Sequence, residues 1–227
     1  FLNKIQKVGY RLSPFIIDVA DVFDKRGIEV GKFRPVIEHH LPNKPLNIDS
    51  DSEAKQKFRR ESAEVWDKRS QEFRKSCRTR MTMNAIAEFR DKERFYIPWS
   101  FDYRGRVYPI PSFLTPQDSD FGKSLIRFAD ESLVTPEAEQ WLSFHIATCF
   151  GLDKEPRDKR YEWTFHNRGL IENIAKDPIA TRSVWEKADE PWQFLAACDE
   201  YYHCVILKDK LCTGLPVAID ATCSGLQ

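Results

Sequence analysis

Apolar residues near the N terminus recur at helical intervals, with polar residues between them. This spacing predicts a helical opening. The positions that carry it are Leu2, Ile5, Val8, Tyr10, Ile16, Ile17, Val19 and Val22. Prolines follow at positions 35, 42 and 45, and they predict an irregular connector over the rest of the first 50 residues.

The stretch from Asp51 to Tyr96 contains neither glycine nor proline. Phe58, Trp66 and Phe73 recur in it at multiples of the helical repeat, with charged residues between them. The pattern predicts one very long helix or two helices in series. Because the apolar stripe is thin, we expect much of this surface to face solvent or a partner.

The pattern changes at Phe95, where short runs rich in aromatic and β-branched residues begin. Residues 95–99 and 106–110 flank Asp102-Tyr103-Arg104-Gly105. This arrangement predicts a two-stranded turn, and the prolines in both runs place it at a sheet edge. A domain that contains β-sheet is therefore expected to start here.

Three helical regions are predicted after this turn. Thr135 and Pro136 provide a cap and a first-position proline for a helix that Gly151 ends. Residues 158–176 and 192–205 carry the other two patterns, with apolar residues at helical spacing.

Histidine and cysteine residues do not fall at metal-binding intervals. His145 lies on the apolar face of its predicted helix, which favours a hydrogen-bonded core histidine over a ligand. The cysteines contain no CxxC pair and no regular spacing, so we expect reduced, buried thiols. They are Cys77, Cys149, Cys198, Cys204, Cys212 and Cys223.

The C-terminal segment carries the strongest candidate for chemistry. Gly214 leads into the apolar run from Leu215 to Ile219, which predicts a short buried strand, and Asp220 follows directly. Catalytic carboxylates often lie at strand ends, because the strand fixes their position and the loop leaves them accessible. An Asp there could equally cap the next helix, and the segment alone leaves both interpretations open.

Composition indicates a folded chain without net charge. The 227 residues include 35 Lys and Arg against 35 Asp and Glu, with 41% hydrophobic and 13% aromatic residues, enough for a sizeable core. Locally the charges separate: residues 55–106 carry a net charge of +7 and residues 130–200 a net charge of −7. The basic stretch fits either a solvated helix surface or a stripe that faces phosphates.

Targeting and membrane signals are not evident in the sequence. No uncharged apolar run reaches the roughly 18–20 residues needed to cross a bilayer. The start, Phe1-Leu2-Asn3-Lys4, lacks an initiator Met and the grading of a signal peptide. We expect a soluble chain with no membrane partner, excised from a longer one.

Two motifs resemble signatures of the single-subunit, DNA-dependent RNA polymerases of bacteriophages and mitochondria. They are DYRGRVY at residues 102–108 and IDATCSGLQ at residues 219–227. Other stretches resemble the phage enzymes in the same order, so the resemblance covers essentially the whole chain. They are LNKIQ, LPNKPLNID, FYIPWSF, Pro116-Gln117 followed by Lys123, WLSFHIATC and FLAACDEY. Ser224, where mitochondrial enzymes usually carry Asn, favours the phage branch.

The resemblance implies an α+β, right-hand polymerase fold, mostly helical with short antiparallel strands. Residues 1–25 would be the tail of an N-terminal domain, 26–92 a helical thumb, and 93–227 the first part of the palm. Fingers and a second carboxylate motif would lie beyond Gln227, so we expect an incomplete fragment that is inactive alone. The implied enzyme is a monomer that transfers nucleotides from NTPs to the RNA 3′ end on a DNA template.

The resemblance also assigns the chemistry. Asp220 corresponds to the family's metal-binding aspartate, so it would be the catalytic carboxylate and hold two Mg²⁺ ions. The backbone carbonyl of Ala221 would be a further ligand, although the family usually has Gly there. Gly225 stands where related DNA polymerases carry a bulky Glu. Its missing side chain would discriminate in favour of ribose, and the alternative is a turn or packing glycine.

Nucleic-acid contacts are implied for the DxxGR motif and for a lysine after it. Arg106 would contact a phosphate or a base edge, Gly105 would let the backbone approach, and an ion pair of Arg104 with Asp102 would orient the arginine fork. Tyr108 would either stack near the template or be a buried edge-strand residue. The implied nucleic-acid-binding residues are Arg104, Arg106, Tyr108 and Lys123, the last as a point charge toward the RNA–DNA hybrid.

The implied partners are a double-stranded DNA promoter or template, the RNA transcript and NTPs. The phage-like features favour the cytoplasm of an infected bacterial host over a mitochondrion or plastid. Two other functions stay open: a noncatalytic helical nucleic-acid clamp, resting on residues 55–106, and a metal-dependent phosphohydrolase that uses Asp220. The hydrolase ranks last, because no compact acidic and His cluster can be assembled around Asp220.

Overall fold

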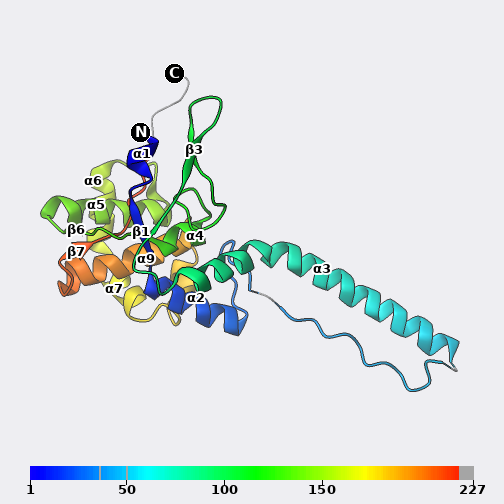
Figure 1. The fold of residues 1–227 in the computed structure, drawn as a ribbon. Helices are drawn as coiled ribbons and strands as arrows, with labels where there is room; N and C mark the ends of the chain where they lie inside the picture. Colours follow the sequence, from blue (N-terminus) through cyan, green and yellow to red (C-terminus); the bar gives the residue numbers. More distant parts are fainter. Residues whose placement is uncertain (36, 50, 220–227) are drawn as a thin grey trace.

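The computed structural model describes residues 1–35, 37–49 and 51–219, and it contains the predicted mixture of helices and short antiparallel strands. A body of packed helices and small sheets carries one long projecting helix (Figure 1). The helices are α1 (Leu2–Ile5), α2 (Pro14–Arg26), α3 (Ser52–Phe89), α4 (Asp120–Leu125), α5 (Pro136–Ala147), α6 (Arg157–His166), α7 (Arg168–Lys176), α8 (Arg182–Trp185) and α9 (Pro191–Tyr201), with the π-helical turns η1 (Thr148–Leu152) and η2 (Tyr202–Leu207). The strands are β1 (Gly9–Leu12), β2 (Phe95–Tyr96), β3 (Trp99–Phe101), β4 (Val107–Pro109), β5 (Ile126–Phe128), β6 (Ser132–Leu133) and β7 (Cys212–Thr213).

The largest sheet is antiparallel and has the strand order β2–β1–β5. Tyr10 of β1 lies opposite Phe95 of β2 and Phe128 of β5, and the ring centroids are 6.2 and 5.7 Å apart. β1 interrupts the predicted helical opening, so that prediction is wrong for residues 9–12. β1 forms because it pairs with β2 and β5, which lie far away in the chain, and the local spacing of apolar residues cannot predict such pairing.

The predicted two-stranded turn is confirmed for β3 and β4. Trp99 pairs with Pro109, and Gly105 lies in the turn at a φ of +76°, which residues with a side chain rarely adopt. Residues 95–96, assigned from the sequence to the same run, pair instead with β1. Pro98 separates β2 from β3, because it has no N–H to donate to a ladder.

α3 is a single helix of 38 residues, the first of the two predicted alternatives. The Asp51 carboxylate caps its start by accepting hydrogen bonds from the amides of Glu53 and Ala54, at 2.9 and 3.1 Å. The N-terminal half projects from the body, with the connector beside it (Figure 1). This arrangement agrees with the thin apolar stripe, because the buried residues of α3 come from its C-terminal half. They are Ser76, Thr79, Thr82 and Ile86.

Aromatic side chains of the core pack around Trp192, near the start of α9. Its ring centroid lies 4.8 Å from that of Phe121 and 5.0 Å from that of Phe33. The Asp120 carboxylate accepts hydrogen bonds from the amides of Trp192 and Gln193, at 2.9 and 3.0 Å. These bonds satisfy free donors at the N terminus of α9 and fix α4 against it.

The helix predicted after Thr135 is confirmed, and the Thr135 hydroxyl caps it. Gly151, in η1, leaves the helical conformation at a φ of +126°. The predicted region 158–176 forms two helices, α6 and α7, which meet at Asn167. The Asn167 side-chain amide donates to the carbonyl of Trp163 at 2.8 Å, a local bond of the kind that competes with helix continuation.

The buried strand predicted for residues 215–219 is wrong. These residues form no regular strand, and Ile219 is 70% exposed. The nearest strand is β7, whose Thr213 lies opposite Ser132 of β6. Pro216 accounts for part of the difference, because it cannot donate a hydrogen bond to a neighbouring strand.

The helices that the structure describes include none that is long and apolar enough to span a membrane. Cysteines in the described ranges are free thiols, and Cys223 lies outside those ranges. The free thiols are Cys77, Cys149, Cys198, Cys204 and Cys212.

His145 is a core histidine, as predicted, and it is 2% exposed. Its ring nitrogens lie 3.7 and 3.8 Å from Sγ of Cys149. Burial lowers the pKa of His145 to about 4. The folded protein therefore keeps this imidazole neutral at pH values where the unfolded chain protonates it.

We predict that His145 makes the folded protein less stable as the pH falls from about 6.5 to about 4. In this window the unfolded chain binds a proton that the folded chain does not. His145→Leu should remove this loss of unfolding free energy, which amounts to about 3 kcal/mol between the two pH values. Urea unfolding at a series of pH values measures it. His166→Leu, at an exposed position on α6, is the control. If it reduced the pH dependence of the free energy of unfolding as much as His145→Leu does, the assignment to His145 would be contradicted.

Candidate active site

The Glu200 carboxylate, on α9, holds the chain segment that precedes Asp220. Glu200 is 1% exposed, and one terminal nitrogen of Arg127, on β5, lies 2.6 Å from both of its oxygens. Lys210 Nζ donates to the same oxygens at 2.9 and 3.0 Å, and the Thr213 hydroxyl donates at 2.6 Å. One buried anion therefore joins α9, β5 and β7 by charge-assisted hydrogen bonds.

Further charges surround Glu200. Glu131 Oε1 lies 3.5 Å from Lys210 Nζ and 3.7 Å from a nitrogen of Arg127, and it forms an ion pair with Arg11 of β1. Burial by itself raises the pKa of Glu200, but the charge of Arg127 and the hydrogen bonds to the carboxylate outweigh it. The pKa of Glu200 therefore lies below its ordinary value, and the group is a carboxylate at neutral pH.

Gly214 brings the same segment against β5. Its carbonyl oxygen accepts a hydrogen bond from the amide of Phe128 at 2.7 Å. A Cβ built on Gly214 would lie 2.5 Å from the carbonyl oxygen of Phe128, a backbone atom that cannot rotate away. Glycine is therefore needed for this close approach.

A cavity of about 310 Å³ lies beside this segment. Lys123 of α4 lines it together with residues 215–218, and Tyr10, Trp99 and Ile126 contribute apolar wall. The Lys123 ammonium makes no hydrogen bond or ion pair with another residue that the structure describes. Of the predicted nucleic-acid-binding residues, Lys123 is thus the one that lies next to the segment leading to Asp220.

The DYRGR motif forms the exposed tip of the β3–β4 hairpin. Asp102 Oδ1 accepts hydrogen bonds from the amides of Arg104 and Arg106, at 2.9 and 2.8 Å. The predicted ion pair of Asp102 with Arg104 is therefore wrong, because the Arg104 guanidinium lies over the Tyr103 ring and donates to its hydroxyl at 2.8 Å. Asp102 instead fixes the backbone of the turn.

The other hairpin residues present open surface. The space around a Cβ built on Gly105 holds no described atom within 4 Å, so another molecule could approach the backbone there. Arg106 is exposed, and its guanidinium makes no hydrogen bond or ion pair within the described ranges. Tyr108 is 42% exposed, so the buried edge-strand interpretation is wrong. None of these three residues lines the cavity at Lys123.

Three predicted site residues, Asp220, Ala221 and Gly225, lie outside the described residues. Their roles stay predictions. Within the part of the chain that the structure describes, no group of three or more His, Cys, Asp and Glu side chains could hold a metal ion.

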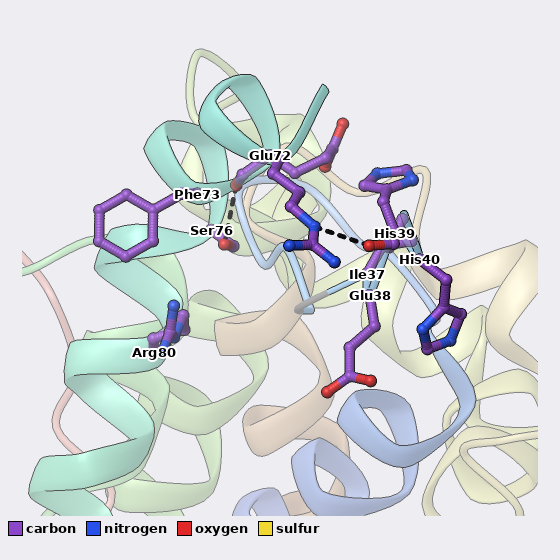
Figure 2. Close-up of a pocket in the computed structure, with 9 residues that line it drawn as sticks. Ile37, Glu38, His39, His40, Glu72, Phe73, Ser76 and Arg80 are labelled. Atoms are coloured by element: carbon purple, nitrogen blue, oxygen red, sulfur yellow. Dashed lines mark hydrogen bonds between the residues drawn. The ribbon is translucent and has the colours of Figure 1, made fainter. Parts of the chain in front are cut away.

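A second cavity, of about 370 Å³, lies between the connector and α3 (Figure 2). Arg69 Nε donates to the carbonyl oxygen of His39 at 2.7 Å and ties the two segments together. Glu38 and Glu72 line this cavity alongside Arg69 and Arg80. The two carboxylates balance the two guanidinium groups, so the cavity lacks the excess positive charge of a phosphate site.

Sequence patterns did not single out Glu200, Arg127 or Thr213. One signal was present: Arg127 interrupts the apolar run Leu125-Ile126-Arg127-Phe128-Ala129, and a charge in such a run predicts a buried ion partner. The partner itself could not be identified, because Arg127 and Glu200 are 73 residues apart.

Comparisons with known proteins agree with the two motifs. A sequence model described as DNA-dependent RNA polymerase matches residues 133–227. T7 RNA polymerase of Escherichia phage T7 is 31% identical over all of this chain, which covers 26% of that protein. The DNA-directed RNA polymerase of Enterobacteria phage K11 is 28% identical over the whole chain, 25% of its length. The mitochondrial DNA-directed RNA polymerase of Neurospora crassa is 29% identical, again over the whole chain, 16% of its length.

The resemblance first carried by two motifs thus extends along the complete sequence. Over its whole length the chain is similar to the single-subunit DNA-dependent RNA polymerases of phages and mitochondria, and the sequence model matches its C-terminal part. It spans about a quarter of the length of the phage relatives it matches.

Proposed function

We propose that this chain acts in a DNA-directed RNA polymerase, which extends RNA with NTPs on a DNA template. The observation that carries the proposal is the match to phage and mitochondrial polymerases along the entire chain. The geometry supports it, since Lys123 places a cation beside the segment that leads to Asp220, where reacting phosphates would need stabilisation. In this proposal residues 26–92 are a thumb and residues 93–227 belong to a palm.

Asp220 is proposed as the metal-binding carboxylate. Its side chain and the backbone carbonyl of Ala221 supply oxygen donors, the ligand type that Mg²⁺ prefers. Two Mg²⁺ ions, when bound, would activate the attacking 3′ oxygen and neutralise the leaving pyrophosphate.

The remaining motif residues complete the proposal. Gly225 would leave room for the ribose 2′-hydroxyl and so favour ribonucleotides. Arg106, exposed on a turn that Asp102 holds rigid, would contact the nucleic acid near the growing end. Lys123 would add a point charge toward the hybrid.

Asp220→Asn should abolish RNA synthesis and leave promoter or template binding nearly intact, because the amide is a poor ligand for Mg²⁺. We expect a loss on the order of 10³-fold in primer extension by the full-length protein. Asp158→Asn, an exposed change on α6, is the matched control and should extend primers at the wild-type rate. Appreciable synthesis by Asp220→Asn would rule out metal ligation. Salt-dependent binding without synthesis, even by the wild type, would favour the noncatalytic clamp.

Arg106→Ala and Lys123→Ala should each weaken retention of the RNA–DNA hybrid and make its salt dependence shallower. Each lost phosphate contact lowers the slope of log affinity against log salt by about one unit. Filter binding or anisotropy at several salt concentrations measures this slope. Arg182→Ala on α8, where the arginine pairs with Glu186, is the control. If the slope of a variant equals the wild-type value, the replaced residue does not contact a phosphate.

A further inference from the structure

Arg78 is the point at which the long helix α3 leaves the body of the molecule. Its guanidinium forms an ion pair with the Asp118 carboxylate, donates to the carbonyl oxygen of Ser112 at 3.4 Å, and lies 5.4 Å from the centroid of the Phe113 ring. Within the described ranges, the hydrogen bonds and ion pairs of the preceding α3 residues stay inside the helix or reach the connector. Arg78 is therefore the first residue of α3 that such a bond fixes to the chain after the helix.

Asp118 is buried and holds the loop 110–119, which runs from β4 to α4. Its side chain is 0% exposed, and the carboxylate accepts hydrogen bonds from the amides of Leu114 and Ser119, at 2.9 and 2.6 Å. Leu114 has a φ of +53°, a left-handed conformation that costs energy for a residue with a side chain. Such a conformation persists only where its surroundings fix it, and Asp118, the partner of Arg78, supplies that constraint.

Gly122, in the first turn of α4, leaves the space that the Asp118 side chain occupies. A Cβ built on Gly122 would overlap the carboxyl carbon of Asp118. Gly122 is not among the glycines with a positive φ, so its backbone conformation does not by itself require glycine. Because glycine weakens a helix relative to alanine, its presence here is explained by the room that it leaves for the partner of Arg78.

The loop 110–119 also holds the β3–β4 hairpin, which carries Arg106. The Gln117 side-chain amide donates to the carbonyl oxygen of Val107, on β4, at 3.1 Å. One loop thus contacts the hairpin through Gln117 and α3 through Asp118. The Arg78–Asp118 pair therefore joins the two basic elements that project from the body (Figure 1).

A small rotation of α3 at Arg78 displaces the far end of the helix by a large distance. At a rise of 1.5 Å per residue, the helix from Ser52 to Arg78 extends about 39 Å. A rotation of about 5° would move Ser52 by about 3 Å, which is the length of a hydrogen bond. The geometry of one ion pair therefore decides where the projecting half of α3 lies.

We propose that Arg78 and Asp118 are positioning residues that set the direction of α3 relative to the β3–β4 hairpin, and that Gly122 is required for their pairing. The inference rests on the proposed function in one respect, that a nucleic acid is what the two basic elements hold. A direct phosphate contact by Arg78, whose side chain is 53% exposed, is the competing explanation. Variants of opposite charge distinguish the two.

Three variants of the full-length protein break the pair with different changes in charge. Arg78→Met removes a positive charge, Asp118→Ala removes a negative charge, and Gly122→Ala changes no charge but displaces the Asp118 side chain. If Arg78 acted only through its charge, the first two variants would have opposite effects on the binding of a polyanion. A positioning role predicts that all three act in the same direction. Lys176→Met and Glu172→Ala, which break an ion pair on α7, are the charge-matched controls.

Two measurements are made on each variant. Pulsed electron paramagnetic resonance measures the distance between spin-labelled amino acids incorporated at Gln56 on α3 and Asp158 on α6, both exposed positions. Each of the three variants should shift or broaden this distance by about 3 Å or more, as expected for a rotation of about 5° or more. Each should also release a labelled RNA–DNA hybrid several-fold faster than the wild type does. Both controls should leave the distance and the release rate unchanged.

Four results would overturn the inference. An unchanged distance in the three variants would show that the pair does not set the direction of α3. Opposite effects of Arg78→Met and Asp118→Ala on hybrid release would assign Arg78 to direct phosphate contact. A changed distance with unchanged release would show that the direction of α3 does not affect the nucleic acid, and equal effects in the controls would reduce the role to overall charge.

Failure of the proposed function gives a different result. If the wild type itself binds no hybrid, the proposed function fails, and the distance measurement still decides whether the Arg78–Asp118 pair directs α3.

Discussion

The Glu200 carboxylate is the point at which the elements around the candidate active site meet. It lies on α9, it is 1% exposed, and it collects donors from Arg127, Lys210 and Thr213. Removing one partner of such a group leaves an uncompensated buried charge, which is strongly destabilising. The position of the segment before Asp220, and of the cavity wall it forms with Lys123, depends on this one anion remaining paired.

Charge that cancels over the sequence is separated in space. The basic residues 55–106 fall on α3 and the β3–β4 hairpin, whereas the acidic residues 130–200 fall on the packed helices from α5 to α9. Figure 1 shows the first two elements projecting from the body. A polyanion would therefore meet positive charge first on these projecting elements.

Local patterns were sufficient where structure depends on near neighbours. The long α3, the hairpin around Gly105 and the helix capped by Thr135 follow from spacing, turn and capping residues, and all three are present. Long-range contacts decided the rest. β1 exists because β2 and β5 pair with it, and the run after Gly214 forms no strand within the described residues. Sequence motifs indicated residues of the candidate site. The ion pair of Glu200 with Arg127 could not be predicted, because the two residues are 73 positions apart and no local pattern relates them.

The proposal that this chain acts in a DNA-directed RNA polymerase can be tested by primer extension with the full-length protein on a DNA template, with Mg²⁺ and either NTPs or dNTPs. We expect template-dependent extension with NTPs and much weaker extension with dNTPs, since Gly225 is proposed to leave room for a ribose 2′-hydroxyl. Extension with neither substrate, or a preference for dNTPs, would contradict it.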